Sequence, residues 1–263
     1  MLQRMIRGLG AALLGTLVTF AQSPAKPRGV RIAAAADLKW ALEEARQVFE
    51  KAHPGVTCTL TFGSSGNFYN QLTQKAPFDL FLSADLGYPQ RLVDQGLGLR
   101  ETLFTYGIGH VVVWVPKASP IPVESLGMKA MQHPAVRKVA MANPKVAPYG
   151  RAAEASLKAS GLLASLQGKL VLGDNVAQTA QFIQTGNADI GLISLSLATS
   201  DQMKGQGRFW AVPGHLHPPL EQGGVVLAWA MDREAALAFR AFLMGPTGKA
   251  LLATYGFGDP APR

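Results

Sequence analysis

The residues with the clearest chemical character in this sequence lie in short turns between predicted strands and predicted helices. One turn contains Ala36 and Asp37, and a second has the sequence Gly-Ser-Ser-Gly at residues 63–66. Small residues let a ligand approach the backbone closely, and serine hydroxyls add donors to the unpaired N–H groups of a helix start. Turns of this composition are suited to binding an oxyanion.

Two turns in the second half of the chain have the same position relative to predicted strands and helices. Residues 143–150 include Tyr149, and residues 173–176 end at Val176. Each turn alone is an ordinary helix start. Four of them facing one cleft would hold a doubly charged anion without a counter-charge, because hydrogen bonds to a charged group contribute about 1.5–3 kcal/mol each.

Alternating strand-like and helical patterns predict the elements that position these turns. Strands are predicted at residues 30–34, 56–62, 78–82, 109–115, 138–142, 169–172, 190–194, 209–213 and 224–229. Helices are predicted at residues 38–49, 66–75, 86–95, 234–243 and 247–254, and from about residues 126, 150 and 176. This repetition predicts an α/β fold with mostly parallel sheets, in which ligands bind at the carboxyl ends of the strands.

Composition excludes several classes of protein. The 263 residues are 48% hydrophobic and 16% charged, so the chain has enough apolar material for a folded core. The formal net charge is +8, but Lys and Arg are spread along the chain without a cluster, and we expect no nucleic-acid partner. Cys58 is the single cysteine, which excludes an internal disulfide and a cysteine-rich metal site.

No catalytic or metal-ligating set stands out elsewhere in the sequence. Ser194 and Ser196 are not part of a Gly-x-Ser-x-Gly motif, and the Gly-rich phosphate loops of nucleotide-binding proteins are absent. His215 and His217 precede two prolines in a predicted surface loop, with no acidic or cysteine partner nearby in the sequence. We therefore predict a binding protein and not an enzyme, with no resident metal ion or cofactor.

The N-terminal residues have the pattern of an export signal. Residues 1–7 carry Arg4 and Arg7, and residues 8–20 are uncharged and mostly apolar. We predict a signal peptide at residues 1–21, cleaved near Ala21, followed by a linker at residues 22–29. The apolar run is too short to span a membrane, so we expect a periplasmic protein without a membrane anchor.

Four segments of the sequence resemble the periplasmic molybdate-binding proteins of ABC uptake systems. They are residues 33–39, 62–68, 76–85 and 142–150, and the resemblance extends in order from residue 30 to residue 257. It implies a two-lobed type II periplasmic binding protein fold with a double crossover hinge. Residues 30–110 plus 226–263 are then expected to form the first lobe, and residues 111–225 the second.

The resemblance also implies molybdate or tungstate as the ligand and the membrane permease of an ABC importer as the partner; we expect a monomer. The family's oxyanion-binding positions fall on Ala36, Asp37, Ser65, Tyr149, Val176 and, by a weaker match, Ser194. The relatives usually have a hydroxyl or amide side chain at the first turn, where this chain has Ala36 and Asp37. Because a carboxylate would repel a dianion, we predict that Asp37 turns back to cap the following helix and that both backbone N–H groups contact the ligand.

Three other interpretations stay open at this point. The same turns could bind sulfate, phosphate or chromate. An exported α/β enzyme is a second alternative, although no nucleophile with a base is visible. A ligand-sensing transcription regulator is a third, although no helix-turn-helix segment precedes residue 30. The sequence does not separate molybdate from tungstate, which have nearly the same size and charge.

Overall fold

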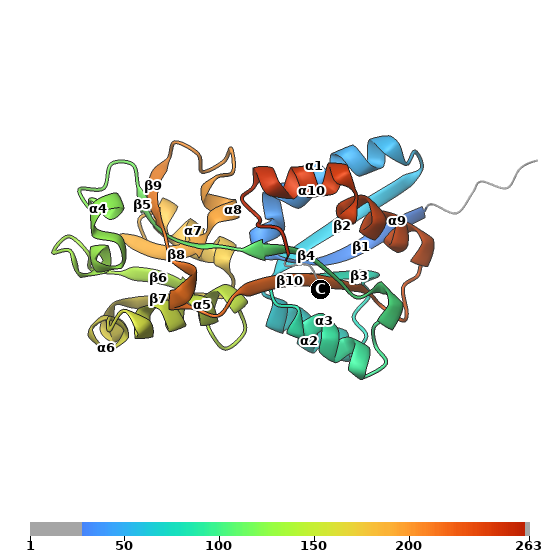
Figure 1. Cartoon of the computed structure of the whole chain (residues 1–263), viewed down its shortest axis with the longest axis horizontal. Coiled ribbons are helices and arrows are strands. Elements are labelled where there is room, and N and C mark those ends of the chain that lie inside the picture. The colour runs from blue at the N-terminus through green and yellow to red at the C-terminus, as the bar shows by residue number, and fades with distance from the viewer. Residues whose placement is uncertain (1–27, 261–263) are drawn as a thin grey trace, which may run out of the picture.

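Two five-stranded sheets form the framework of the computed structural model, which describes residues 28–260 (Figure 1). The strand order is β2-β1-β3-β10-β4 in the first lobe and β7-β6-β8-β5-β9 in the second. In both sheets the first three strands are parallel and the fourth is antiparallel to its neighbours. The predicted α/β class with two lobes is confirmed, and the two sheets share one topology.

The first lobe is built from both ends of the described chain. Its strands are β1 (Arg28–Ala35), β2 (Val56–Gly63), β3 (Leu80–Ser83), β4 (Phe104–Gly109) and β10 (Leu220–Val226). Its helices are η1 (Ala36–Leu38), α1 (Lys39–Ala52), α2 (Ser65–Thr73), α3 (Gly87–Asp94), η2 (Arg100–Thr102), α9 (Arg233–Met244) and α10 (Pro246–Thr254). Figure 1 shows α1, α9 and α10 on one face of this sheet and α2 and α3 on the other.

Apolar side chains at helical spacing hold the early and late segments of the first lobe together. In α1, Leu42 and Phe49 are fully buried, and the Phe49 ring meets the Phe239 ring of α9 edge-on, with 5.1 Å between the centroids. Parallel β2 and β3 flank β1, and helices cover both faces of the sheet, so residues 32–35 of β1 are buried (Figure 1). These contacts fix the carboxyl end of β1, where η1 and α1 begin.

The second lobe is continuous in sequence. Its strands are β5 (Val111–Pro116), β6 (Val139–Ala142), β7 (Leu170–Gly173), β8 (Ile190–Ser194) and β9 (Gly207–Ala211). Its helices are α4 (Val123–Leu126), η3 (Gly127–Gln132), α5 (Pro148–Ala159), α6 (Leu163–Leu166), η4 (Gln167–Lys169), α7 (Val176–Gln184), α8 (Leu195–Ala198) and η5 (Gly214–Leu216). Its core is continuous with Ala35, Ala36 and Ala84 of the first lobe, so the lobes touch where these small residues lie.

Two short segments connect the lobes, and they differ from the prediction in one respect each. The strand expected at residues 109–115 is β5, which begins at Val111. The strand β4 was not predicted, and His110 separates it from β5, which lies in the other sheet. The boundary expected at residue 225 falls inside β10, whose Gly223 and Gly224 pair with β3 of the first sheet. Residues 220–225 therefore belong to the first lobe. The prediction missed the start of β10 because the polar residues Glu221 and Gln222 precede the apolar pattern of residues 224–229.

The N-terminal predictions fall mostly outside the described residues. This holds for the signal peptide at residues 1–21 and for residues 22–27 of the linker, whereas residues 28 and 29 already belong to β1. Within residues 28–260, no helix has the length and hydropathy needed to cross a membrane.

Candidate functional site

Helix starts from both lobes surround a small cavity at the carboxyl ends of the strands. The cavity has a volume of about 10 Å³, close to the room that one buried water needs, so the helix starts lie near one another. The first lobe contributes Ala35, Ala36, Asp37, Gly63, Ser64, Ser65 and Ala84, and the second contributes Ala147, Pro148, Tyr149, Asn175 and Val176. Asp37 is the one residue with a formal charge in this set.

The start of α2 provides a hydroxyl and backbone donors. Ser64 is the N-cap, and its side chain accepts a hydrogen bond from the Asn67 N–H at 3.4 Å. The Ser65 Oγ accepts from the Ala84 N–H at 3.0 Å, which leaves the Ser65 hydroxyl proton for another acceptor. The Ser65 N–H is in the first turn of the helix and has no intrahelical acceptor. Both Ser65 groups are suited to an anion.

The start of α2 also contacts the second lobe directly. The Gly66 N–H donates to the Val146 carbonyl at 2.9 Å. A Cβ at residue 66 would lie within 3.0 Å of Val146 and of the Tyr88 hydroxyl, so glycine is needed for this approach. The contact sets α2 next to the turn that precedes α5.

In the second lobe, α5 and α7 begin at the same cavity. Pro148 is the first residue of α5, and Tyr149 follows it in the first turn. Asn175 is the N-cap of α7, and its side chain accepts from the N–H groups of Ala177 and Gln178 at 3.0 Å each. The first-turn N–H groups of Tyr149 and Val176 have no intrahelical acceptor. The positive ends of these helix dipoles favour a negative charge in the cavity.

Asp37 belongs to a buried polar network behind the cavity. Its Oδ2 accepts from the Gln222 Nε2 at 2.6 Å, and the same Nε2 lies 3.1 Å from the Tyr149 hydroxyl. The Tyr106 hydroxyl lies 3.0 Å from the Gln222 Oε1 and 2.9 Å from the Ser83 carbonyl. The Asp37 Oδ1 has no hydrogen-bond partner among the described residues. One carboxylate oxygen is therefore satisfied and the other is not.

Burial changes the proton affinities in this network. Removal from water raises the pKa of Asp37 to about 6, against the lowering effect of hydrogen bonds from Gln222 and Tyr149. Burial and the nearby Asp37 carboxylate raise the pKa of Tyr106 and of Tyr149 well above the usual range. The two phenols stay protonated, and Asp37 is the group that titrates.

The side chain of Asp37 does not lie as predicted. Neither η1 nor α1 has a side-chain cap, and the Asp37 carboxylate hydrogen-bonds to Gln222 of β10 instead. Asp37 is the second residue of η1, and Ala35 occupies the N-cap position. The carboxylate thus hydrogen-bonds to the buried amide of Gln222 in place of capping the following helix, and Asp37 lines the cavity wall.

Five of the six predicted site residues lie around the cavity. They are Ala36, Asp37, Ser65, Tyr149 and Val176. Ser194 is separate from this lining: it is the N-cap of α8, where its Oγ accepts from the Leu197 N–H at 3.3 Å. The Ser196 hydroxyl lies 3.0 Å from the Ser194 Oγ and 2.8 Å from the Asp37 carbonyl oxygen, so Ser194 is linked to the Asp37 turn through Ser196.

Sequence reasoning did not find Gln222 and Tyr106, which hold Asp37 in place. Gln222 is fully buried in β10 and Tyr106 is buried in β4. The available signal was an amide two residues before the predicted apolar strand at residues 224–229, since glutamine is uncommon in a buried position. The pair His215 and His217 lies at η5, and the described residues contain no group of three or more His, Cys, Asp or Glu that could hold a metal ion.

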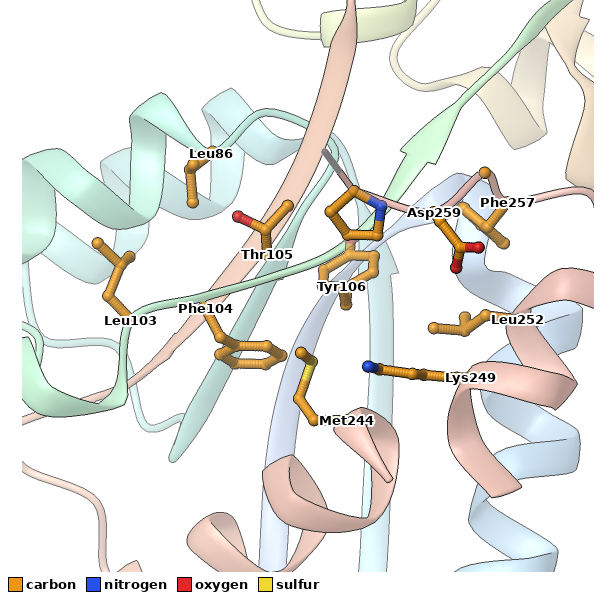
Figure 2. Close-up of a pocket in the computed structure, with 12 residues that line it drawn as sticks. Leu86, Leu103, Phe104, Thr105, Tyr106, Met244, Lys249, Leu252, Phe257 and Asp259 are labelled. Carbon is orange, nitrogen blue, oxygen red and sulfur yellow. The ribbon is translucent and has the colours of Figure 1, made fainter. Parts of the chain in front are cut away.

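A larger hollow of about 650 Å³ lies on the first lobe, away from the helix starts (Figure 2). Phe104 and Tyr106 of β4 line one side of it, and Met244 and Lys249 line another. The ring of Tyr106 therefore separates this hollow from Gln222 and the small cavity. The hollow contains no converging set of anion donors.

Comparison with known proteins decides the family. The family model described as "Bacterial extracellular solute-binding protein" matches residues 30–258. This chain belongs to that family. The solute-binding protein is 36% identical over 259 residues to the molybdate-binding protein ModA of Azotobacter vinelandii, covering 98% of each chain. It is also 36% identical over 248 residues to ModA of Rhodobacter capsulatus, covering 94% of this chain and 95% of the relative.

A solved structure agrees with the sequence relatives. The structure of the Azotobacter vinelandii periplasmic molybdate-binding protein has a TM-score of 0.82 and 30% identity, covering 88% of this solute-binding protein and 99% of that chain. The predicted resemblance and the type II periplasmic binding protein fold are thus confirmed. These relatives are binding proteins, which confirms the expectation that the chain is not an enzyme.

Proposed function

We propose that this protein captures molybdate or tungstate outside the cytoplasm and delivers it to the membrane permease of an ABC importer. The observation that carries the proposal is the convergence of uncharged donors from helix starts of both lobes on one cavity. The two relatives named as molybdate-binding proteins support the choice of ligand.

The chemistry of the cavity fits a tetrahedral dianion. The Ser65 hydroxyl and the first-turn N–H groups of α2, α5 and α7 are neutral donors, and helix dipoles add positive potential. A smaller anion leaves some of these buried donors unpaired, at about 1–3 kcal/mol for each. The site therefore selects by size and by the direction of its hydrogen bonds.

Ligand capture works by closure of the two lobes. An anion that contacts Ser65 on the first lobe and Val176 on the second binds the closed state more tightly than the open state, and so shifts the population toward closure. The crossings at residue 110 and at residues 212–219 are the places where the chain passes between lobes and can absorb the movement. The permease would recognise the closed form.

The export and assembly predictions complete the proposal. We infer that residues 1–21 are removed on export and that the mature protein acts in the periplasm as a monomer, without a cofactor. Intact mass of the protein from a periplasmic extract tests both points. We expect the mass of a single chain that begins at Gln22. A mass that includes the N-terminal segment would contradict its removal, and the mass of a dimer would contradict the monomer.

Isothermal titration calorimetry on the ligand-free mature protein tests the function. Molybdate and tungstate should bind with one site per chain. Sulfate, phosphate and chromate should bind about tenfold to hundredfold more weakly for each donor that they leave unpaired. Strong binding of sulfate together with little heat from molybdate would overturn the choice of ligand in favour of another tetrahedral oxyanion.

A further inference from the structure

Asp37 is a buried carboxyl group with one unsatisfied oxygen on the wall of the proposed oxyanion cavity. Its residue exposure is 1%, and it is one of the residues that line the cavity. The Oδ2 accepts from the Gln222 Nε2 at 2.6 Å, whereas the Oδ1 has no partner among the described residues. Buried polar atoms in folded proteins nearly always have a partner, so the Oδ1 is the place where a ligand can supply one.

The network around Gln222 fixes which oxygen of Asp37 accepts. The Gln222 Oε1 lies 3.0 Å from the Tyr106 hydroxyl, and the Nε2 therefore faces Asp37 and Tyr149. Because the Oδ2 accepts a hydrogen bond from this amide, a proton bound to the carboxyl group belongs on the Oδ1. A protonated Asp37 is then a hydrogen-bond donor on the cavity wall.

Among residues 28–260, no cation balances a charge on Asp37. The titratable groups that face it are the phenols of Tyr106 on β4 and Tyr149 on α5. The packed elements α7 and α8 contain no ionisable side chain, and β2 contains only Cys58. The charged residues of the remaining neighbours have other positions or partners. In α1, Glu43, Arg46 and Glu50 pair together, Glu44 meets Tyr255, Lys39 lies over Trp40 and Lys51 is exposed. In α5, Arg151 pairs with Asp85 and Lys158 with Glu154, and in β10, Glu221 is exposed.

We propose that Asp37 is a specificity-determining residue that binds the oxyanion as a neutral carboxyl group, donating its Oδ1 proton to an oxygen of the anion. Capture of a dianion is then coupled to the uptake of one proton from solvent. This inference rests on the proposed function.

Two physical effects favour the neutral carboxyl group of Asp37 when the anion is bound. An ionised carboxylate and a dianion within one dry cavity repel each other strongly, because little water screens them. Burial already favours the neutral carboxyl, and the pKa of Asp37 is about 6 before any anion is present. A bound dianion raises that pKa further. At neutral pH the carboxyl group is largely ionised in the free protein and must take up a proton on binding.

The test is titration calorimetry with molybdate in two buffers of different ionisation enthalpy, from about pH 6 to about pH 9. The wild-type protein should take up close to one proton per molybdate near pH 8, and its Kd should rise by up to tenfold per pH unit above about pH 6. Asp37→Asn has a neutral amide of the same shape. It should take up no proton and bind with a Kd that does not change with pH. Asp201→Asn removes an exposed carboxyl that is not part of the cavity lining; it is the matched control and should behave as wild type.

Each outcome decides a different point. Molybdate binding without proton uptake, at a Kd that is the same for wild type and Asp37→Asn at every pH, overturns the inference and leaves the proposed function intact. Preference of the wild-type protein for hydrogen phosphate, lost in Asp37→Asn, also overturns it, because the anion would then carry the proton. Absence of molybdate and tungstate binding across this pH range overturns the proposed function and the inference with it.

Discussion

Ser65 is the residue whose hydroxyl geometry makes it the clearest donor to an anion. Its Oγ already accepts from the Ala84 N–H, so its proton is directed to a different acceptor. Ser65→Ala removes this donor, and we expect molybdate binding to weaken about tenfold to hundredfold, the loss of one hydrogen bond to a charged group. Calorimetry measures the change.

A control separates this local effect from a general one. Ser165 on α6 is exposed, and its hydroxyl donates to the Leu162 carbonyl at 2.9 Å, far along the chain from the cavity turns. Ser165→Ala should leave the Kd for molybdate unchanged. Equal affinities for Ser65→Ala and the wild-type protein would mean that the hydroxyl does not contact the anion.

Asp37 also predicts how stability depends on pH in the ligand-free protein. Its folded pKa of about 6 is above the ordinary value of 3.8, so the carboxyl favours folding below about pH 4 and loses that contribution as the pH rises through 6. Asp37→Asn should therefore be more stable than wild type at pH 7.5 by up to about 3 kcal/mol. The difference should vanish near pH 4.

Urea unfolding at the two pH values measures this difference in the free energy of unfolding. The comparison with Asp37→Asn at each pH cancels the contributions of the other carboxylates, which both proteins share. A wild-type protein that is the more stable of the two at pH 7.5 would show that the ionised carboxylate is stabilised by a partner, contrary to the unsatisfied Oδ1.

At the scale of elements, the end of β4 holds the network that supports the site. A Cβ at Gly109 would overlap the Gln222 amide nitrogen and the Tyr149 hydroxyl. Gly109→Ala must therefore displace one of these groups, and we expect a loss of about 1–3 kcal/mol in stability together with weaker molybdate binding. Gly168→Ala is the control, because a Cβ at that position has no neighbour within 4 Å.

Thermal unfolding and calorimetry on the two glycine variants give the readouts. Gly168→Ala should match wild type in both. If Gly109→Ala also matches wild type in both, then the close contact between β4, Gln222 and Tyr149 does not support the site.

The elements themselves were largely predictable from sequence, whereas their partners across the fold were not. The apolar stripe of α1 through Leu42 and Phe49 identifies the helix by its spacing alone. The change of sheet at His110 leaves no such signal. The strand β4 contains a threonine and two glycines and was not predicted, and a single residue separates it from the apolar β5. The orientation of Asp37 depends on Gln222, which is 185 residues away in sequence, so local capping rules gave the wrong result.

The site residues also include some that the sequence predicts and some that it does not. The turns that contain Ser65, Tyr149 and Val176 were predictable because turns after strands in an α/β fold meet at one edge of the sheet, whereas the individual residues followed from the family resemblance. Ser194 also follows a strand, β8, and caps α8, but it is not among the residues that line the cavity. Only the three-dimensional arrangement separates these two cases.

At the scale of the whole molecule, polar contacts across the lobes favour the closed arrangement. Arg151 of α5 forms an ion pair with Asp85, which follows β3, and its Nη1 donates to the Tyr88 hydroxyl at 3.1 Å. Both members of the ion pair are partly exposed, so the pair contributes modestly. Arg151→Ala should weaken molybdate binding about twofold to fivefold, because the closed state loses a contact that the open state lacks.

Salt and a control variant check this interpretation. The effect of Arg151→Ala should shrink at high ionic strength, where the exposed pair is screened. Arg100 pairs with Asp94 within the first lobe at 3.9 Å, so Arg100→Ala should leave the Kd unchanged. Small-angle scattering should show a larger radius of gyration for ligand-free Arg151→Ala than for ligand-free wild type. Equal radii of gyration together with equal Kd values would exclude a role of Arg151 in closure.

A crystal structure of the mature protein with molybdate tests whether donors from both lobes converge on one tetrahedral anion. We expect the anion in the small cavity, with oxygens contacted by Ser65 from the first lobe and by the α5 and α7 starts from the second. An anion held by one lobe alone, or bound in the hollow beside Lys249, would show that the two lobes do not share one binding site.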